Sequence, residues 1–207
     1  MKYLILLILW GGYCFIHSLL ISTKFINVTS RLLKKYFAFY RLFYIVVSVV
    51  LLIPLINYSE QISSEVIIEF TFPLNIIRYA LMWGSLLIFF WAFFFSYDSL
   101  SFFGIRQIMN FWKKNEHTES GTIKKSGLLG ITRHPMYLTL IIYLWCQTYT
   151  LKDIYVNLLL TVYVIIGTIL EEKKLVLEFG EEYLRYRQEV PMLIPFFKRK
   201  VIRTSRA

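Results

Sequence analysis

The chain has 207 residues, of which 57% are hydrophobic and only 17% charged, against about a quarter charged in a soluble domain. A domain of this size cannot bury so much apolar surface, which excludes a soluble globule and predicts one membrane domain over residues 1–207. The net charge of +10 lies in short segments beside apolar runs, which argues against nucleic-acid binding. Only three histidines and two cysteines are present, without zinc-ligand spacing, so we expect no metal site.

Five apolar runs follow one another along the chain. A spanning helix needs about 20 mostly apolar residues, and a shorter one is tolerated if it tilts or packs under its neighbours. We therefore expect an all-α polytopic membrane protein of about five transmembrane helices, ending in a tight helical hairpin and carrying a cytoplasmic cofactor site. The predicted helices cover residues 3–21, 37–57, 74–97, 136–150 and 154–170.

The distribution of basic residues predicts the orientation in the membrane. Twenty of the 23 Lys and Arg residues fall in alternate segments of the five-helix path, which lie on the same side of the membrane. Residues 58–73, on the other side, contain three Glu and no Lys or Arg. Cytoplasmic segments carry the excess of Lys and Arg. We therefore expect a bacterial inner-membrane protein with its N-terminus outside and its C-terminus on the cytoplasmic side. The cofactor-site segments, residues 98–135 and 171–207, should also lie on the cytoplasmic side.

The first polar block runs from residue 117 to residue 137. Pro135 disfavours helix at His134 and suits the first helical turn itself, so Arg133 and His134 should lie extended where the fourth helix begins. The free N–H groups of that helix start would form an anion site. An arginine that merely anchors the helix at the membrane surface is the alternative. Three glycines would let the backbone approach a flat ligand, namely Gly121, Gly127 and Gly130.

The second polar block follows the fifth helix. Glu171 and Glu172 stand where that helix leaves its apolar run, and an ionisable pair at such a depth is a site candidate. Glu171 shares a helix face with Leu175 and Phe179, so we expect Glu171 to face inward and to hold an ammonium group. We expect Glu172 to be solvated and Gly180 to end the helix.

Together the two blocks resemble the isoprenylcysteine carboxyl methyltransferase family from about residue 121 to residue 195. The pattern is Arg-His-Pro-Met-Tyr from residue 133, then Glu-Glu-x-x-Leu-x-x-x-Phe-Gly-x-x-Tyr-x-x-Tyr-x-x-x-Val-Pro from residue 171. Near the N-terminus, His17-Ser-Leu-Leu and Arg41-Leu-Phe-Tyr resemble the NnrU and methanethiol S-methyltransferase branch of that family. One position departs from the family pattern, because members often carry Tyr where this chain has Leu129.

The resemblance implies a membrane methyltransferase that uses S-adenosyl-L-methionine, with the adenosine against residues 121–124 and the methionine ammonium at Glu171. The implied cofactor-binding residues are Gly121, Thr122, Ile123, Lys124, His134, Pro135, Met136, Tyr137 and Glu171. The acceptor would be a thiol or a lipophilic carboxylate. A cation near such an acceptor favours its anionic form, and our candidates for that catalytic role are Arg133 and Arg187.

Two other functions stay open at this point. NnrU-like proteins make a non-catalytic membrane accessory protein a serious alternative. A sterol-reductase-like enzyme that uses NADPH has similar architecture, but a paired carboxylate suits an ammonium better than a 2′-phosphate. His17 could be functional or a hydrogen-bonded packing residue, and we expect Asp98 to pair with a loop cation.

The predicted orientation is testable by cysteine labelling. In a Ser63→Cys variant, a membrane-impermeant thiol reagent should label the residue from outside intact cells, because residues 58–73 lack the basic residues of a cytoplasmic segment. Labelling only after the membrane is made permeable would contradict the orientation.

Overall fold

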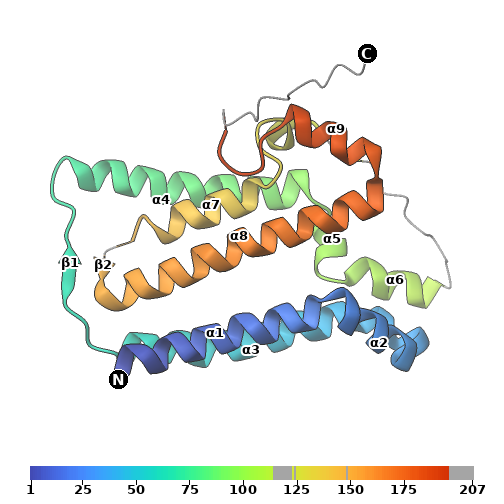
Figure 1. Ribbon diagram of the computed structural model, residues 1–207, viewed down its shortest axis with the longest axis horizontal. Helices are drawn as coiled ribbons and strands as arrows, with labels where there is room; N and C mark the ends of the chain where they lie inside the picture. Colours follow the sequence, from blue (N-terminus) through green and yellow to red (C-terminus); the bar gives the residue numbers. More distant parts are fainter. Residues whose placement is uncertain (114–122, 124, 148, 196–207) are drawn as a thin grey trace, which may run out of the picture. The chain divides into compact units, whose positions relative to one another are not determined.

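The computed structural model describes residues 1–113, 123, 125–147 and 149–195, and most of these residues are helical (Figure 1). They form two compact units. Unit 1 comprises residues 1–71, 98–119 and 148–163, and unit 2 comprises residues 72–97, 120–147 and 164–207. One helix, α8 (Leu151–Phe179), runs from the first unit into the second.

Unit 1 is built on α1, α3 and the first part of α8. Its apolar core contains Leu6 and Trp10 from α1 together with Leu55 from α3. Two short strands pair antiparallel, and Lys152 donates hydrogen bonds to the carbonyls of Ser59 and Ile62 at the end of α3. The elements of this unit are α1 (Lys2–Ile21), α2 (Thr23–Leu33), the 3₁₀ helix η1 (Lys34–Phe39), α3 (Tyr40–Gln61), β1 (Val66–Ile68), α5 (Ser99–Phe102), α6 (Ile105–Lys113) and β2 (Tyr149–Thr150).

Unit 2 pairs α4 with α7 and adds the second part of α8 and α9. Gly180 has a φ of +55°, a left-handed conformation that glycine adopts without strain, and it separates α8 from α9 as predicted. The chain thereby returns Tyr183 and Tyr186 to a small core that they form with Val190. The elements of this unit are α4 (Leu74–Trp91), the π-helical turn η2 (Ala92–Ser96), the 3₁₀ turn η3 (Gly127–Gly130), α7 (Pro135–Leu144) and α9 (Glu181–Glu189).

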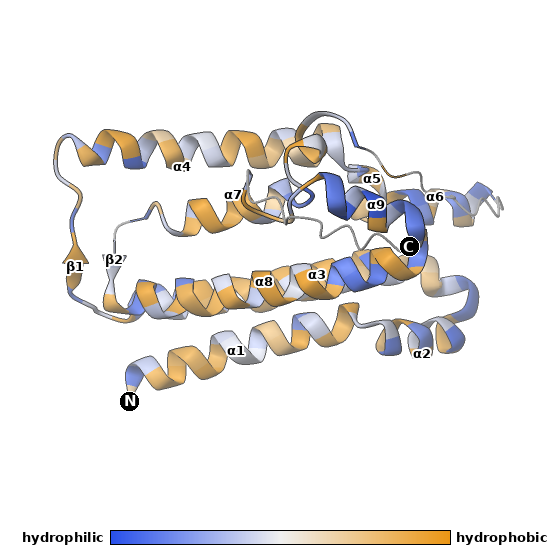
Figure 2. Cartoon of the chain, turned by 45° about the horizontal axis from the view of Figure 1, so that its top comes forward, coloured by the Kyte–Doolittle hydropathy of each residue, from blue (hydrophilic) through white to orange (hydrophobic). Residues whose placement is uncertain are grey.

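Four segments of the described chain are long and apolar enough to cross a membrane, namely Lys2–Ile21, Thr23–Gln61, Leu74–Ser96 and Leu151–Phe179. Most residues of α1 and α4 are coloured as hydrophobic in Figure 2. Many of their side chains are exposed, including Phe15, Leu87 and Trp91. Exposed apolar surface of this extent marks contact with lipid. The prediction of an all-α polytopic membrane protein is confirmed.

The predicted end of the fourth helix is wrong. The fourth helix, α7, ends at Leu144 rather than at residue 150, because Tyr149 and Thr150 form β2 against β1. The fifth helix, α8, extends beyond the predicted membrane span of residues 154–170 and ends at Phe179, in agreement with the predicted stop at Gly180, because residues 171–179 are mostly good helix formers. The glutamates at 171 and 172 are therefore inside a helix.

Gly104 gives a test of the packing in unit 1. It has a φ of +78°, and an added Cβ would lie 3.0 Å from the Cβ of Arg41 and 3.2 Å from the backbone nitrogen of Leu42. Gly104→Ala should therefore lower the unfolding free energy by about 1–2 kcal/mol from the backbone conformation alone, with the steric contact adding to it. The control is Gly84→Ala, which meets nothing within 4 Å. Equal thermal unfolding of the two variants in detergent would contradict this packing.

Candidate active site

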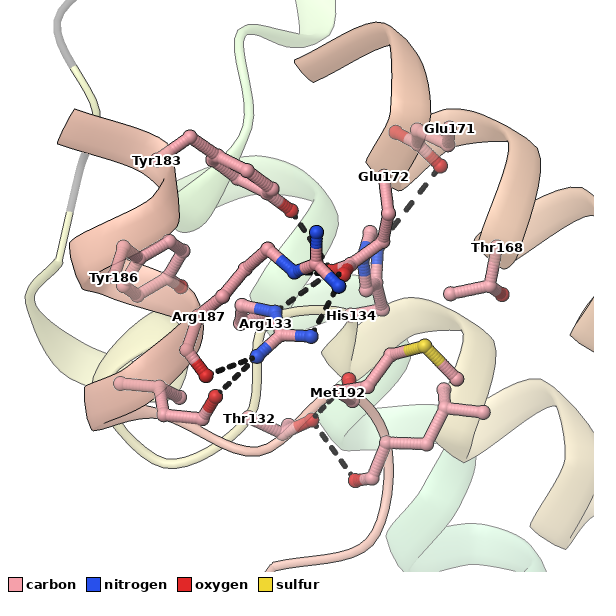
Figure 3. Close-up of polar contacts among 12 residues, drawn as sticks. Thr132, Arg133, His134, Thr168, Glu171, Glu172, Tyr183, Tyr186, Arg187 and Met192 are labelled. Carbon is pink, nitrogen blue, oxygen red and sulfur yellow. Dashed lines mark hydrogen bonds and ion pairs between the residues drawn. The ribbon is translucent and has the colours of Figure 1, made fainter. Parts of the chain in front are cut away.

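The candidate site of unit 2 forms where three segments meet around one carboxylate. These segments are residues 132–134 before α7, the C-terminal part of α8, and α9 with the residues that follow it. Arg133, His134, Tyr183 and Arg187 all point toward Glu172 (Figure 3). Sequence reasoning predicted that the two polar blocks cooperate, and the structure brings described residues of both together.

The stretch before α7 is not helical, in line with the effect of Pro135, but the backbone of His134 is not in the extended region. His134 is the N-cap, with φ −127° and ψ 65°, and Pro135 occupies the first turn of α7. The backbone N–H of Arg133 donates to the carbonyl of Pro191 at 3.0 Å, and that of His134 donates to Met192 at 3.2 Å. The backbone donors of Arg133 and His134 are therefore satisfied by the segment after α9.

Arg133 is buried and makes a two-pronged contact with Glu172. Its Nε donates to Oε1 at 2.7 Å, and its Nη2 donates to Oε2 at 2.8 Å. Its Nη1 donates to the carbonyls of Arg187, at 3.1 Å, and Val190. These bonds use four of the five N–H groups of a guanidinium, so Arg133 ties α7, α8 and α9 together.

Glu172 is only 4% exposed, so the expectation that it is solvated is wrong. Besides Arg133, its Oε1 accepts from His134 Nε2 at 3.0 Å and from the Tyr183 hydroxyl at 2.9 Å. Its Oε2 lies 3.2 Å from Arg187 Nε. Two guanidinium groups and these hydrogen bonds favour the ionised carboxylate, which offsets the cost of burying it.

The two tyrosines of α9 close the other side of this network. The Tyr186 hydroxyl donates to the carbonyl of Leu129 at 2.5 Å, which fixes η3 against α9. Burial is the main cause that raises the pKa of Tyr186 to about 12, and Glu172 adds to the shift while Arg133 opposes it. Burial and the neighbouring Glu172 charge also raise the pKa of Tyr183. Both hydroxyls are therefore protonated donors near neutral pH.

His134 and Glu171 leave two acceptors facing each other. Because His134 Nε2 meets a carboxylate, it must carry a proton, and Nδ1 is an acceptor when the ring is neutral. That Nδ1 lies 3.9 Å from Oε2 of Glu171, which is a buried atom without a hydrogen-bond partner among the described residues. The ring of His134 also stacks on Tyr137, with centroids 5.6 Å apart. The gap between these acceptors suits a cationic N–H donor.

The other predicted site residues are distributed as follows. Ile123 packs against the cluster of Tyr183, Tyr186 and Val190. Pro135, Met136 and Tyr137 form the first turn of α7. Gly121, Thr122 and Lys124 lie outside the described residues.

Sequence reasoning missed the central place of Glu172, although a signal for it exists. Val164, Thr168 and Glu172 recur every four residues and are all buried, so they mark the inward face of α8 in unit 2. It also missed Tyr97, which follows η2. Burial is the first cause that raises the pKa of Tyr97, followed by the nearby charges of Glu171 and Tyr186.

Two weaker candidates belong to unit 1. Nδ1 of His17 lies 2.8 Å from the hydroxyl of Tyr163, which also accepts from Ser18. This is a hydrogen-bonded histidine between α1 and α8, one of the two alternatives left open. Asp98 pairs with Arg106 at 2.8 Å and caps α5, so its predicted pairing with a loop cation is confirmed.

Comparisons with known proteins give one consistent group. Methanethiol S-methyltransferase from a Pseudomonas species is 38% identical over 94 residues, which are 45% of this chain and 36% of that protein. The protein of the same name from Crocosphaera subtropica is 34% identical over 99 residues, 47% of this chain and 38% of that protein. The one from Mycobacterium tuberculosis is 29% identical over 103 residues, 49% of this chain and 42% of that protein.

The chain therefore spans well under half the length of the curated relatives it matches. No protein-family profile matches the chain. No solved structure matches it either. The predicted resemblance to the methanethiol S-methyltransferase branch is confirmed over just under half of the chain.

The Glu172 network predicts a large effect on stability. Glu172→Gln keeps the shape of the side chain but removes the charge opposite the buried Arg133, so the unfolding free energy should fall by about 3–5 kcal/mol. Glu178→Gln, a matched change at an exposed position of the same helix, should leave thermal unfolding in detergent unchanged. Equal unfolding temperatures for the two variants would show that the network contributes little.

Proposed function

We propose that the chain catalyses methyl transfer from S-adenosyl-L-methionine to a small thiol, with methanethiol as the first acceptor to test. The curated relatives carry the name methanethiol S-methyltransferase, which supports a methyl donor and a thiol acceptor. A lipophilic carboxylate is the other acceptor class. We further propose that the site faces the cytoplasm of a bacterial inner membrane, in line with the excess of basic residues in its segments.

The facing acceptors of Glu171 and His134 carry the proposal. Oε2 of Glu171 has no donor among the described residues, and Nδ1 of His134 is 3.9 Å away with its other nitrogen committed to Glu172. A buried acceptor without a partner costs about 1–3 kcal/mol, so the arrangement suits a ligand that brings N–H donors and positive charge. The α-ammonium group of S-adenosylmethionine has both properties.

The remaining cofactor contacts are assigned by position. Tyr137 stacks on His134 at the start of α7, and Ile123 lies against the α9 tyrosines, so these residues would line the middle and the adenosine end of the cofactor. Leu129 presents its carbonyl to Tyr186 and is itself buried, so Tyr97 is the nearby aromatic residue that would replace the family tyrosine.

The two arginines take different roles in this proposal. Arg133 uses four N–H groups on protein acceptors and positions Glu172, His134 and the end of α9. Arg187 has a side chain that is 39% exposed and reaches Glu172 through Nε. The guanidinium group of Arg187 is therefore better placed than that of Arg133 to contact an incoming thiolate. Arg133 acts as a positioning residue.

The chemistry asks little acid–base work of the protein. The bound cofactor supplies a methyl group on a sulfonium centre. The thiol would lose its proton to solvent beside Arg187, and a cofactor held at Glu171 and His134 would supply the methyl group to the thiolate and leave as a neutral thioether. The protein contributes alignment of the two sulfurs and a cation that favours the thiolate.

The direct test is product formation. The purified chain in lipid nanodiscs, given methanethiol and S-adenosylmethionine, should release dimethyl sulfide, measured by gas chromatography of the headspace. Protection from heat by S-adenosylhomocysteine, NADPH or neither separates the methyltransferase from the reductase-like enzyme and the accessory protein. Protection by NADPH alone, or by neither ligand, would overturn the proposal.

Glu171 should decide cofactor affinity. Glu171→Gln removes one charged hydrogen bond, worth roughly 1.5–3 kcal/mol, so the affinity for S-adenosylhomocysteine should fall about ten- to hundredfold by calorimetry. Glu178→Gln serves as the matched control on the same helix. An unchanged affinity in Glu171→Gln would remove this carboxylate from the cofactor site.

Arg187 should affect the acceptor rather than the cofactor. A cation near an acid lowers its pKa by about 1–3 units, so Arg187→Gln should move the rate profile to higher pH and lower kcat near neutral pH about tenfold. Arg187→Lys retains the charge and should restore most of the rate. Cofactor affinity should stay within about twofold of the wild type in both variants, and a profile that does not move would contradict the role.

A further inference from the structure

Unit 1 presents a surface that the proposed reaction does not use, formed by α2, η1 and α6. We call this surface the basic collar and define it as residues 23–39 and 105–113. η1 contacts both α2 and α6, and the ring of Phe111 packs against Tyr36 and Phe39, with centroids 6.1 and 5.3 Å away. The three helical segments therefore form one continuous surface.

In α2, basic and apolar residues share the exposed face. Lys24, Val28, Arg31 and Leu32 stand at positions i, i+4, i+7 and i+8 and are all exposed. Figure 2 shows both hydrophilic and hydrophobic residues along α2. None of the α2 residues is buried, and Leu32 is 76% exposed. An exposed face that carries both kinds of side chain suits the membrane surface, where the apolar groups enter the hydrocarbon and the long cationic side chains reach the headgroups.

The same arrangement recurs in α6. Ile105, Met109 and Trp112 are exposed at positions i, i+4 and i+7, and Trp112 is 74% exposed. Lys113 is exposed beside them, whereas Phe111 faces η1. A tryptophan in this setting is typical of the headgroup level of a bilayer.

Charge and chain continuity both indicate what covers the collar. The sequence has no Asp or Glu in residues 22–59 or 99–113, and Asp98 is paired with Arg106. Only Ser22 separates α1 from α2, and η1 runs directly into α3. The collar therefore connects the C-terminal end of one apolar helix, α1, to the N-terminal end of another, α3. The exposed basic side chains of the collar are Lys24, Arg31, Lys34, Lys35 and Lys113.

We propose that the basic collar binds the phosphate groups of anionic phospholipids, with Leu32, Met109 and Trp112 inserted among the upper parts of the acyl chains. Zwitterionic lipids offer the same acyl chains without net negative charge, so the collar should discriminate between the two. The proposal does not depend on the methyltransferase activity.

The test uses the whole chain in detergent, titrated with phosphatidylglycerol or with phosphatidylcholine of the same acyl chains, and native mass spectrometry to count bound lipids. The wild type should bind phosphatidylglycerol at least about tenfold more tightly. Each basic residue near a membrane surface contributes about 1 kcal/mol, so the affinity should fall about fivefold per charge removed. The double variant Lys24→Gln with Arg31→Gln should therefore lose about 25-fold for phosphatidylglycerol and little for phosphatidylcholine.

A matched control removes the same net charge elsewhere. Lys2→Gln with Lys173→Gln changes two exposed lysines outside the collar and should leave the preference intact. Lys34→Gln with Lys35→Gln repeats the test within η1, and thermal unfolding without lipid shows that each variant is folded. Equal affinity for the two lipids, equal loss in the control, competition by inorganic phosphate alone, or a dimer in place of lipid binding would each overturn the proposal.

Discussion

A single buried carboxylate imposes the arrangement of the candidate site. Glu172 cannot remain charged away from water unless donors surround it, and Arg133, His134, Tyr183 and Arg187 supply them. These donors come from two segments on either side of α8 in the sequence. The position of residues 132–134 before α7 and the angle of α9 are therefore both fixed by one side chain.

The same constraint separates two adjacent glutamates by role. Successive residues on an α-helix point about 100° apart, so Glu172 faces the donors while Glu171, whose side chain is 37% exposed, faces elsewhere. Because Glu172 accepts a hydrogen bond from His134 Nε2, it also fixes which ring nitrogen faces Glu171. The carboxylate of Glu172 is thus already surrounded by donors, whereas the carboxylate of Glu171 can still accept a hydrogen bond.

Much of the fold could be predicted from the sequence, because long apolar runs, Pro135 and Gly180 act through local physics. The end of α7 could not, since Tyr149 pairs with Ile68, a contact between residues far apart in the chain. The spacing of Leu175 and Phe179, which follow Glu171, predicts that Glu171 is the inward-facing glutamate. The buried face of α8 is instead marked by residues that precede the two glutamates. Thr168 is fully buried one turn before Glu172, and that spacing was the available signal.

The pairing of residues 132–134 with Pro191, Met192 and Leu193 bears on how the protein is made. A ribosome releases α7 and α8 well before it releases these three residues. Until then the backbone donors of Arg133 and His134 have no native acceptors, and the guanidinium lacks the carbonyl of Val190. The polar cluster of unit 2 is thus completed only after Leu193 has been released, and a nascent chain halted before Leu193 would expose an unfinished polar cluster to quality-control proteases.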